Sequence, residues 1–193
     1  MSHKGIHIFL KLEKISKKSG GIVIIYKSCL EDFLFFPKTD CEYVQWCKFK
    51  KGVLMDDKEI LLGCVYIPPE NSVYSSPEAF NDIEEEFLKL SRPNTLGAFL
   101  GDFNAKCGKL QDYVEPDESL LDILNLYDEI DLIDFLYDFE NLTRQGIPPL
   151  RVSQDENKPN SFGVKLIEFC NKHNFYIGNS RLPGDDQNIG KKT

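Results

Sequence analysis

The sequence lacks any apolar run of about 18 residues, the length that a membrane-spanning helix requires. Its basic start, MSHKGIHIFLKLEKISKK, has neither the long apolar core nor the small-residue cleavage site of a signal peptide. It has no C-x-x-C pair, and its six scattered cysteines favour reduced core thiols over disulfide bridges or zinc ligands. We therefore expect an intracellular protein, nuclear or cytoplasmic, without a membrane partner.

Positive charge is also scarce, and the charge that is present is unevenly placed. The formal net charge is -8, and residues 111–160 hold thirteen acids against three basic residues. Residues 1–27, in contrast, carry six lysines and one Glu. The acidic balance argues against a protein that simply coats nucleic acid, but it does not exclude an enzyme that meets nucleic acid through a local basic face.

The order of apolar patterns predicts an α/β protein. With 193 residues and 41% hydrophobic residues, the chain can build one domain with a real core. Short β-branched or alternating runs predict strands, and amphipathic stretches predict helices, the first of them with Ser76 as N-cap. The predicted strands are 19–27, 42–51, 59–69, 95–104 and 175–180, and the clearest helices are 76–90 and 161–174. Early strands with short links and later strands alternating with helices indicate a layered α/β sandwich with a mixed sheet.

The predicted strand TLGAFLGDFN ends on two polar residues that could carry chemistry, Asp102 and Asn104. Ligands of layered α/β folds collect beyond the carboxyl ends of core strands. An Asp there can accept a proton from water or bind a hard cation. If the chain stays extended, the Asn104 side chain lies on the same side and its amide can donate to a phosphate oxygen, while Phe103 anchors the turn. On local chemistry alone, an Asx turn is the commoner interpretation.

Tyr66 stands at the end of another predicted core strand, in the stretch CVYIPP. The two prolines that follow would fix its direction, and its hydroxyl could then hydrogen-bond a phosphate. A core aromatic with its hydroxyl at the rim is the alternative.

Taken in order, these stretches resemble the endonuclease/exonuclease/phosphatase superfamily, which has a DNase I-like fold of two mixed β-sheets flanked by helices. The narrower likeness is to the endonuclease domains of LINE-type retrotransposons and to craniofacial-development-protein-like sequences. The stretches that carry it are SGGIVIIYK, CVYIPP, FLGDFNAKCG, RVSQDENKPNSFGVKLIEFCNKHNFYIGNSRLPGDD and GKKT. The resemblance covers most of residues 19–193 as a partial domain, which includes the acidic segment 111–160, after a basic segment 1–18.

The resemblance implies a hydrolase that cleaves phosphodiester or phosphomonoester bonds with Mg²⁺ or Mn²⁺ and no other small-molecule cofactor. Asp102 matches the family residue that orients or deprotonates the attacking water, and it is the candidate metal ligand. Asn104 matches the residue that holds the phosphate, and Tyr66 the residue that contacts it. DNA is the implied partner.

Three further residues lie in matching stretches near the implied site. Arg151 and Asp155 belong to RVSQD, a motif of the retroelement branch whose role the sequence does not specify. Asn179 matches a recurrent Asn after the late strand of the family.

The departures from the family pattern are at the two ends. The family's metal-binding Glu comes from a strand upstream of the Gly-Gly strand, whereas here the one earlier acid, Glu13, stands among lysines. The family's closing Asp-His or Asp-Tyr would follow Thr193. These departures make the domain look truncated and give three hypotheses: an endonuclease, an inactive fragment or interaction module on the same fold, and a phosphatase of the same superfamily.

Overall fold

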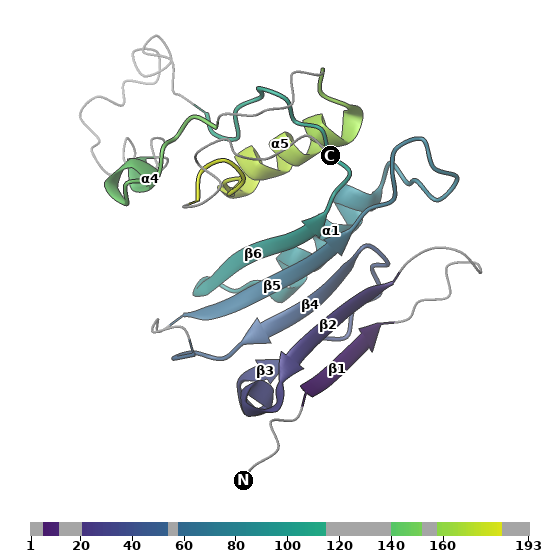
Figure 1. Cartoon of the computed structure of the whole chain (residues 1–193), viewed down its shortest axis with the longest axis vertical. Coiled ribbons are helices and arrows are strands. Elements are labelled where there is room, and N and C mark those ends of the chain that lie inside the picture. Colours follow the sequence, from purple (N-terminus) through teal and green to yellow (C-terminus); the bar gives the residue numbers. More distant parts are fainter. Residues whose placement is uncertain (1–5, 12–20, 54–57, 115–139, 152–157, 183–193) are drawn as a thin grey trace. The chain divides into compact units, whose positions relative to one another are not determined.

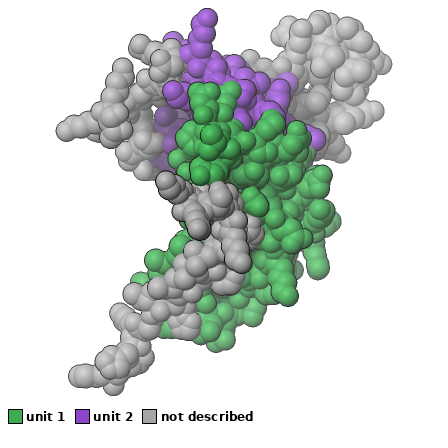
Figure 2. Space-filling model, turned by 90° about the vertical axis from the view of Figure 1, so that its right-hand side faces the viewer, with its two compact units in different colours: residues 1–104 green, residues 105–193 purple. Residues whose placement is uncertain are grey.

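A computed structural model describes residues 6–11, 21–53, 58–114, 140–151 and 158–182 of the chain (Figure 1). The chain divides into two compact units, residues 1–104 (unit 1) and residues 105–193 (unit 2), which Figure 2 shows in different colours. Each unit is described by itself.

Unit 1 contains a four-stranded sheet of order β3-β4-β5-β6. Its strands are β3 (Leu34–Phe35), β4 (Val44–Phe49), β5 (Glu59–Tyr66) and β6 (Thr95–Asp102). The pairs β3–β4 and β4–β5 are antiparallel, whereas β5 and β6 are parallel and are joined through helix α1 (Ala79–Leu90). The sheet is therefore mixed, as the sequence predicts, and β6 forms one of its edges.

A separate antiparallel pair in unit 1 is formed by β1 (Ile6–Lys11) and β2 (Ile22–Lys27). The short 3-10 helix η1 (Ser28–Phe33) follows β2 directly. Strand β2 contacts β5 although the two strands belong to different sheets. In the described residues this second sheet is antiparallel, whereas the resemblance implied two mixed sheets.

Helix α1 and the sheet share an aromatic core. The ring of Trp46 on β4 lies 5.4 Å from Phe99 on β6 and 6.3 Å from Phe87 on α1. Gly63 of β5 sits between the two strands, and a Cβ there would lie 2.8 Å from ring atoms of both Trp46 and Phe99. The absence of a side chain at this position thus lets the two rings meet across the middle strand.

One carboxylate ties α1 to the segment that leads into β4. The Glu86 oxygens accept hydrogen bonds from the backbone N–H of Asp40 and Cys41, both at 2.8 Å, and from Nε1 of Trp46 at 2.9 Å. The hydroxyl of Thr39 donates to the same carboxylate. Four donors from one loop and one strand are therefore satisfied by a single helical side chain.

Unit 2 is organised around α5 (Ser161–His173) and contains the short helix α4 (Glu140–Arg144). Asn160 caps α5, because its Oδ1 accepts from the N–H of Gly163 at 2.8 Å and from that of Lys106 at 2.9 Å. Its own N–H donates to the carbonyl of Lys106. Gly163 faces the same carbonyl so closely that a Cβ would lie 1.9 Å from it. The segment that follows β6 is thus held on the first turn of α5.

Most predicted elements are confirmed, and the exceptions have physical causes. Residues 175–180 form no strand; after α5 the chain passes through Asn174 in the left-handed conformation (φ 54°) and into a turn. Helix α1 begins at Ala79, later than predicted, although the Ser76 hydroxyl still accepts from the N–H of Glu78. Strand β1 is not predicted, because its alternation stands within a lysine-rich segment. Residues 115–139 of the acidic segment lie outside the described residues. None of the described helices combines the length and the apolar character of a membrane span.

Removal of the Glu86 acceptor should loosen the contact between α1 and β4. We expect Glu86→Gln to lower the free energy of unfolding by about 2 kcal/mol, because an amide NH₂ would face the partly buried donors of Cys41 and Trp46. Glu85→Gln is the matched control, since the Glu85 side chain is 71% exposed and, among the described residues, its ion pair is with the exposed Lys89. Urea unfolding followed by Trp46, the one tryptophan of the chain, measures both. Equal midpoints for the two variants would contradict this role of Glu86.

The thiols should differ sharply in reactivity. Burial raises the pKa of Cys41 and Cys47 to about 11 and that of Cys170 to about 12, whereas Cys29 is exposed. At pH 8 the three buried thiols stay protonated in the folded chain, so we expect iodoacetamide to label Cys29 first. Mass spectrometry of the native protein would locate the label, with urea-unfolded protein as the control in which all thiols react. Early labelling of Cys170 would contradict the described packing of α5.

Candidate active site

Two of the predicted site residues meet at the carboxyl ends of β5 and β6. Tyr66 and Asp102 are Cα partners at the last register position of this parallel pair. Residues that are directly opposite each other in neighbouring strands direct their side chains to the same face of the sheet. The fold thus brings together two polar side chains that are 36 positions apart in the sequence.

The glycine of the Gly-Asp-Phe-Asn motif is required by the backbone. Gly101 has φ +143°, a conformation that other residues rarely adopt, and a Cβ there would lie 1.9 Å from the carbonyl oxygen of Val65. Only glycine permits β6 to approach β5 this closely just before Asp102. The role of Gly101 in the motif is therefore structural.

Asn104 joins the two strand ends. Its Nδ2 donates to the carbonyl of Ile67 at 2.8 Å, and its backbone N–H donates to Oδ1 of Asp102 at 2.8 Å. The N–H of Ile67 donates to the Asp102 carbonyl at 2.9 Å. Asn104 is in the left-handed conformation (φ 48°) and not extended, so the alternation that was expected to align its side chain with that of Asp102 does not apply. The Asx turn, the commoner interpretation of this stretch, is therefore present at Asp102.

Asp102 and Tyr66 keep polar groups that the described residues do not use. The Asp102 side chain is exposed, and its Oδ2 accepts no hydrogen bond from a described residue. Tyr66 is half-buried, its backbone N–H donates to the Tyr43 carbonyl, and its hydroxyl makes no hydrogen bond to a described residue. A carboxylate and a phenol at one strand end can together accept a proton from water and donate a hydrogen bond to an oxyanion.

Phe103 anchors the turn, as expected. Its ring stacks on Phe80 of α1, with centroids 6.3 Å apart and an interplanar angle of 27°. Phe80 is buried on the first turn of the helix. The contact fixes the chain between Asp102 and Asn104 and so restricts the direction of both.

The described residues do not complete a metal site at Asp102. Among them, no three His, Cys, Asp or Glu side chains are grouped so that they could hold an ion. Asp102 supplies one carboxylate at this strand end, whereas Mg²⁺ is usually bound by one or two carboxylates together with substrate oxygens and water. Glu13 lies outside the described residues. Among the described residues, Asp102 is therefore the candidate metal ligand at this strand end.

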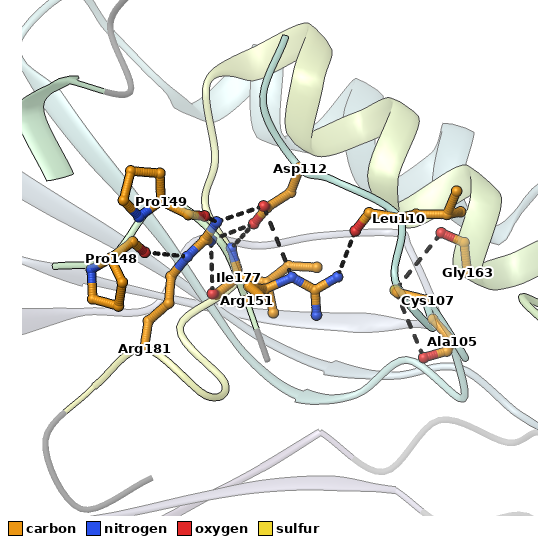
Figure 3. Close-up of polar contacts among 10 residues, drawn as sticks. All are labelled: Ala105, Cys107, Leu110, Asp112, Pro148, Pro149, Arg151, Gly163, Ile177 and Arg181. Carbon is orange, nitrogen blue, oxygen red and sulfur yellow. Dashed lines mark hydrogen bonds and ion pairs between the residues drawn. The ribbon is translucent and has the colours of Figure 1, made fainter. Parts of the chain in front are cut away.

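The remaining predicted residues belong to unit 2. Asn179 is exposed in the turn after α5, and Asp155 lies outside the described residues. The side chain of Arg151 is 9% exposed, its Nη2 donates to the Leu110 carbonyl at 2.8 Å, and its Nε lies 3.8 Å from Oδ1 of Asp112. Arg151 is therefore part of a buried charged cluster (Figure 3).

The other two members of that cluster carry no recognisable sequence signal. Asp112 and Arg181 form a bidentate ion pair, with Nη1 to Oδ2 at 2.6 Å and Nη2 to Oδ1 at 2.8 Å, and both side chains are almost fully buried. The N–H of Ile177 donates to the same carboxylate at 2.6 Å. The pair fixes the segment after α5 to residue 112, and it escaped prediction because 69 positions separate its members.

Comparison of the chain with family models, with curated proteins and with solved structures found no match. The resemblance to the endonuclease/exonuclease/phosphatase superfamily is accordingly a hypothesis that depends on the quoted motifs and on the geometry at the ends of β5 and β6.

The close approach at Gly101 can be tested by substitution. Gly101→Ala should lower the free energy of unfolding by about 3 kcal/mol or more, because the new methyl meets the Val65 carbonyl and the backbone conformation is strained. Gly52→Ala is the control: Gly52 also has a positive φ, but no atom lies within 4 Å of its Cβ position, so about 1 kcal/mol is expected. Urea unfolding measures both, and a smaller loss for Gly101→Ala than for Gly52→Ala would contradict the described approach.

Proposed function

We propose that the chain is a phosphodiesterase domain of the endonuclease/exonuclease/phosphatase superfamily, with DNA as substrate and Mg²⁺ or Mn²⁺ as cofactor. The observation that carries the proposal is the register of the parallel pair. It places Tyr66 opposite Asp102 at the carboxyl ends of β5 and β6, the edge at which layered α/β enzymes bind their ligands.

The chemistry of the two side chains suits a phosphodiester. Hydrolysis needs a water molecule held in line with the leaving oxygen and donors that stabilise the charge on the phosphate oxygens. Oδ2 of Asp102 is the group that would orient the water and take its proton. The Tyr66 hydroxyl would donate to a phosphate oxygen. Asn104 would act as a positioning residue, since its amide holds Ile67 and its N–H holds Asp102.

The architecture of unit 1 is compatible with the DNase I-like arrangement that this proposal includes. Helix α1 packs on the mixed sheet through Trp46 and Phe99, and the antiparallel pair β1–β2 contacts the same sheet at β5. A central pair of sheets with helices outside is the arrangement of that fold. This arrangement of helix and sheets supports the α/β class of the chain more firmly than it supports membership of the superfamily.

One observation favours a second candidate, an inactive module on the same fold. The described residues supply one carboxylate at the strand end where the family's enzymes use several. Such a module would keep the fold and the turn at Asp102 without turning over a phosphoester.

Nicking of supercoiled plasmid DNA by the purified chain, with Mg²⁺ or Mn²⁺ and with EDTA as the blank, distinguishes the two candidates. We expect Asp102→Asn to lower the nicking rate at least about 100-fold, because it removes the proton acceptor. Tyr66→Phe should lower it about tenfold, because it removes one hydrogen bond to the phosphate.

Asp32→Asn is the matched control, since Asp32 is an exposed acid of unit 1 in η1, away from the ends of β5 and β6. It should nick at the rate of the unchanged chain. Equal rates for Asp102→Asn and Asp32→Asn would remove Asp102 from the mechanism. No turnover of plasmid DNA or of p-nitrophenyl phosphodiesters under any of these conditions would support the inactive module.

A further inference from the structure

Among the described residues, the buried cluster of unit 2 has more positive than negative charge. One carboxylate, Asp112, is shared there by two guanidinium groups: Arg181 lies 2.6 Å from it, and Arg151 lies 3.8 Å from it. The side chains of all three are at least nine-tenths buried. A buried charge without a counter-ion is costly, so the extra cation needs an anionic partner.

The two arginines differ in how well they are satisfied. Arg181 donates five hydrogen bonds: to both Asp112 oxygens and to the carbonyls of Pro148, Pro149 and Ile177. This number equals the five N–H groups of a guanidinium. Arg151 donates one, to the Leu110 carbonyl, and its buried Nε has no hydrogen-bond partner. Asp112 is already engaged by Arg181 and by the Ile177 N–H. The unsatisfied cation is therefore Arg151 (Figure 3).

Arg151 lines a pocket of about 330 Å³, a volume within the range of small-molecule sites. The pocket has a second cation, Lys109, which is exposed. The rest of the lining is largely apolar, with Leu110, Tyr113, Pro149 and Leu150. It also includes Gln111 and Asp112, whose carboxylate accepts from Arg181 and from the Ile177 N–H. A cavity with cationic groups and apolar walls suits a ligand with an anionic head and a small apolar body.

We propose that this pocket binds the oxyanion group of a small ligand, a carboxylate or a phosphate, through Arg151 with Lys109 as the second cation. The planar guanidinium matches the oxygens of either group. The bound anion would balance the second arginine of the cluster, and the apolar body of the ligand would contact Leu110 and Leu150. The site is independent of the proposed function, because all of its residues lie in unit 2.

Calorimetric titration of the full chain with three probes that share a phenyl ring tests the proposal. The probes are benzoate, phenyl phosphate and the neutral benzamide, at constant ionic strength. We expect saturable one-to-one binding of at least one anion, and benzamide binding at least about tenfold more weakly. Binding of benzoate alone would assign a carboxylate ligand, and binding of phenyl phosphate alone a phosphate ligand. The proposal would be overturned by binding of neither anion, or by equal binding of benzamide.

Substitution of the two cations that line the pocket tests whether the anion binds there. Lys109→Gln should weaken the binding of the anion about threefold to tenfold, while Lys158→Gln, an exposed lysine of unit 2 outside the pocket lining, should leave it unchanged. Arg151→Gln should abolish binding. If Arg151→Gln does not fold, Arg151→Lys replaces it: this variant keeps the charge but loses the planar fork, and it should bind at least about threefold more weakly. Unchanged affinity in both Lys109→Gln and the folded Arg151 variant would rule out this pocket.

Discussion

The carboxylate of Glu86 is the contact on which the packing of unit 1 depends. It is presented by the middle of α1 and accepts from the Asp40 and Cys41 backbone and from the indole of Trp46. Without it, the turn before β4 would have to leave several donors unsatisfied next to the aromatic core. The same helix carries Phe80, on which the ring of Phe103 stacks. A polar contact in the middle of α1 and an aromatic contact in its first turn thus hold the helix on the sheet in which Tyr66 pairs with Asp102.

The sequence predicted the parts of the fold that follow from local patterns. Apolar runs identified β2, β4, β5 and β6, and amphipathic spacing identified α1 and α5. Strand β1 was missed because its lysine-rich surroundings concealed its alternation. The strand predicted at 175–180 was wrong because its apolar residues pack next to α5, where the ring of Phe175 stacks on Phe169. Short apolar runs do not distinguish a strand from a packed turn; the contacts that decide between them come from elsewhere in the chain.

The Gly-Asp-Phe-Asn motif shows how much of a site a sequence can predict. Three of its four letters have a structural reason: Gly101 permits a close approach, Phe103 packs on α1, and Asn104 adopts the left-handed conformation and binds Ile67. The structural reason for Asp102 is partial, since its Oδ1 accepts from the Asn104 N–H whereas its Oδ2 accepts nothing from the described residues. The sequence could predict the turn and the carboxylate. It could not predict that the Asn104 amide is directed to a backbone carbonyl, nor the Asp112–Arg181 pair, because both depend on partners far along the chain.

The parallel pairing of β5 and β6 also has a consequence for the order in which the molecule folds. Strands β4 and β5 are antiparallel and adjacent in sequence, so they can pair early and at low entropic cost. Strand β6 can join them only after α1 has crossed the face of the sheet, which makes it a late, non-local step. Tyr66 and Asp102 become neighbours in that step. A chain arrested before it would have the β4–β5 hairpin but no strand-end site, so the site depends on the least local pairing of the four-stranded sheet.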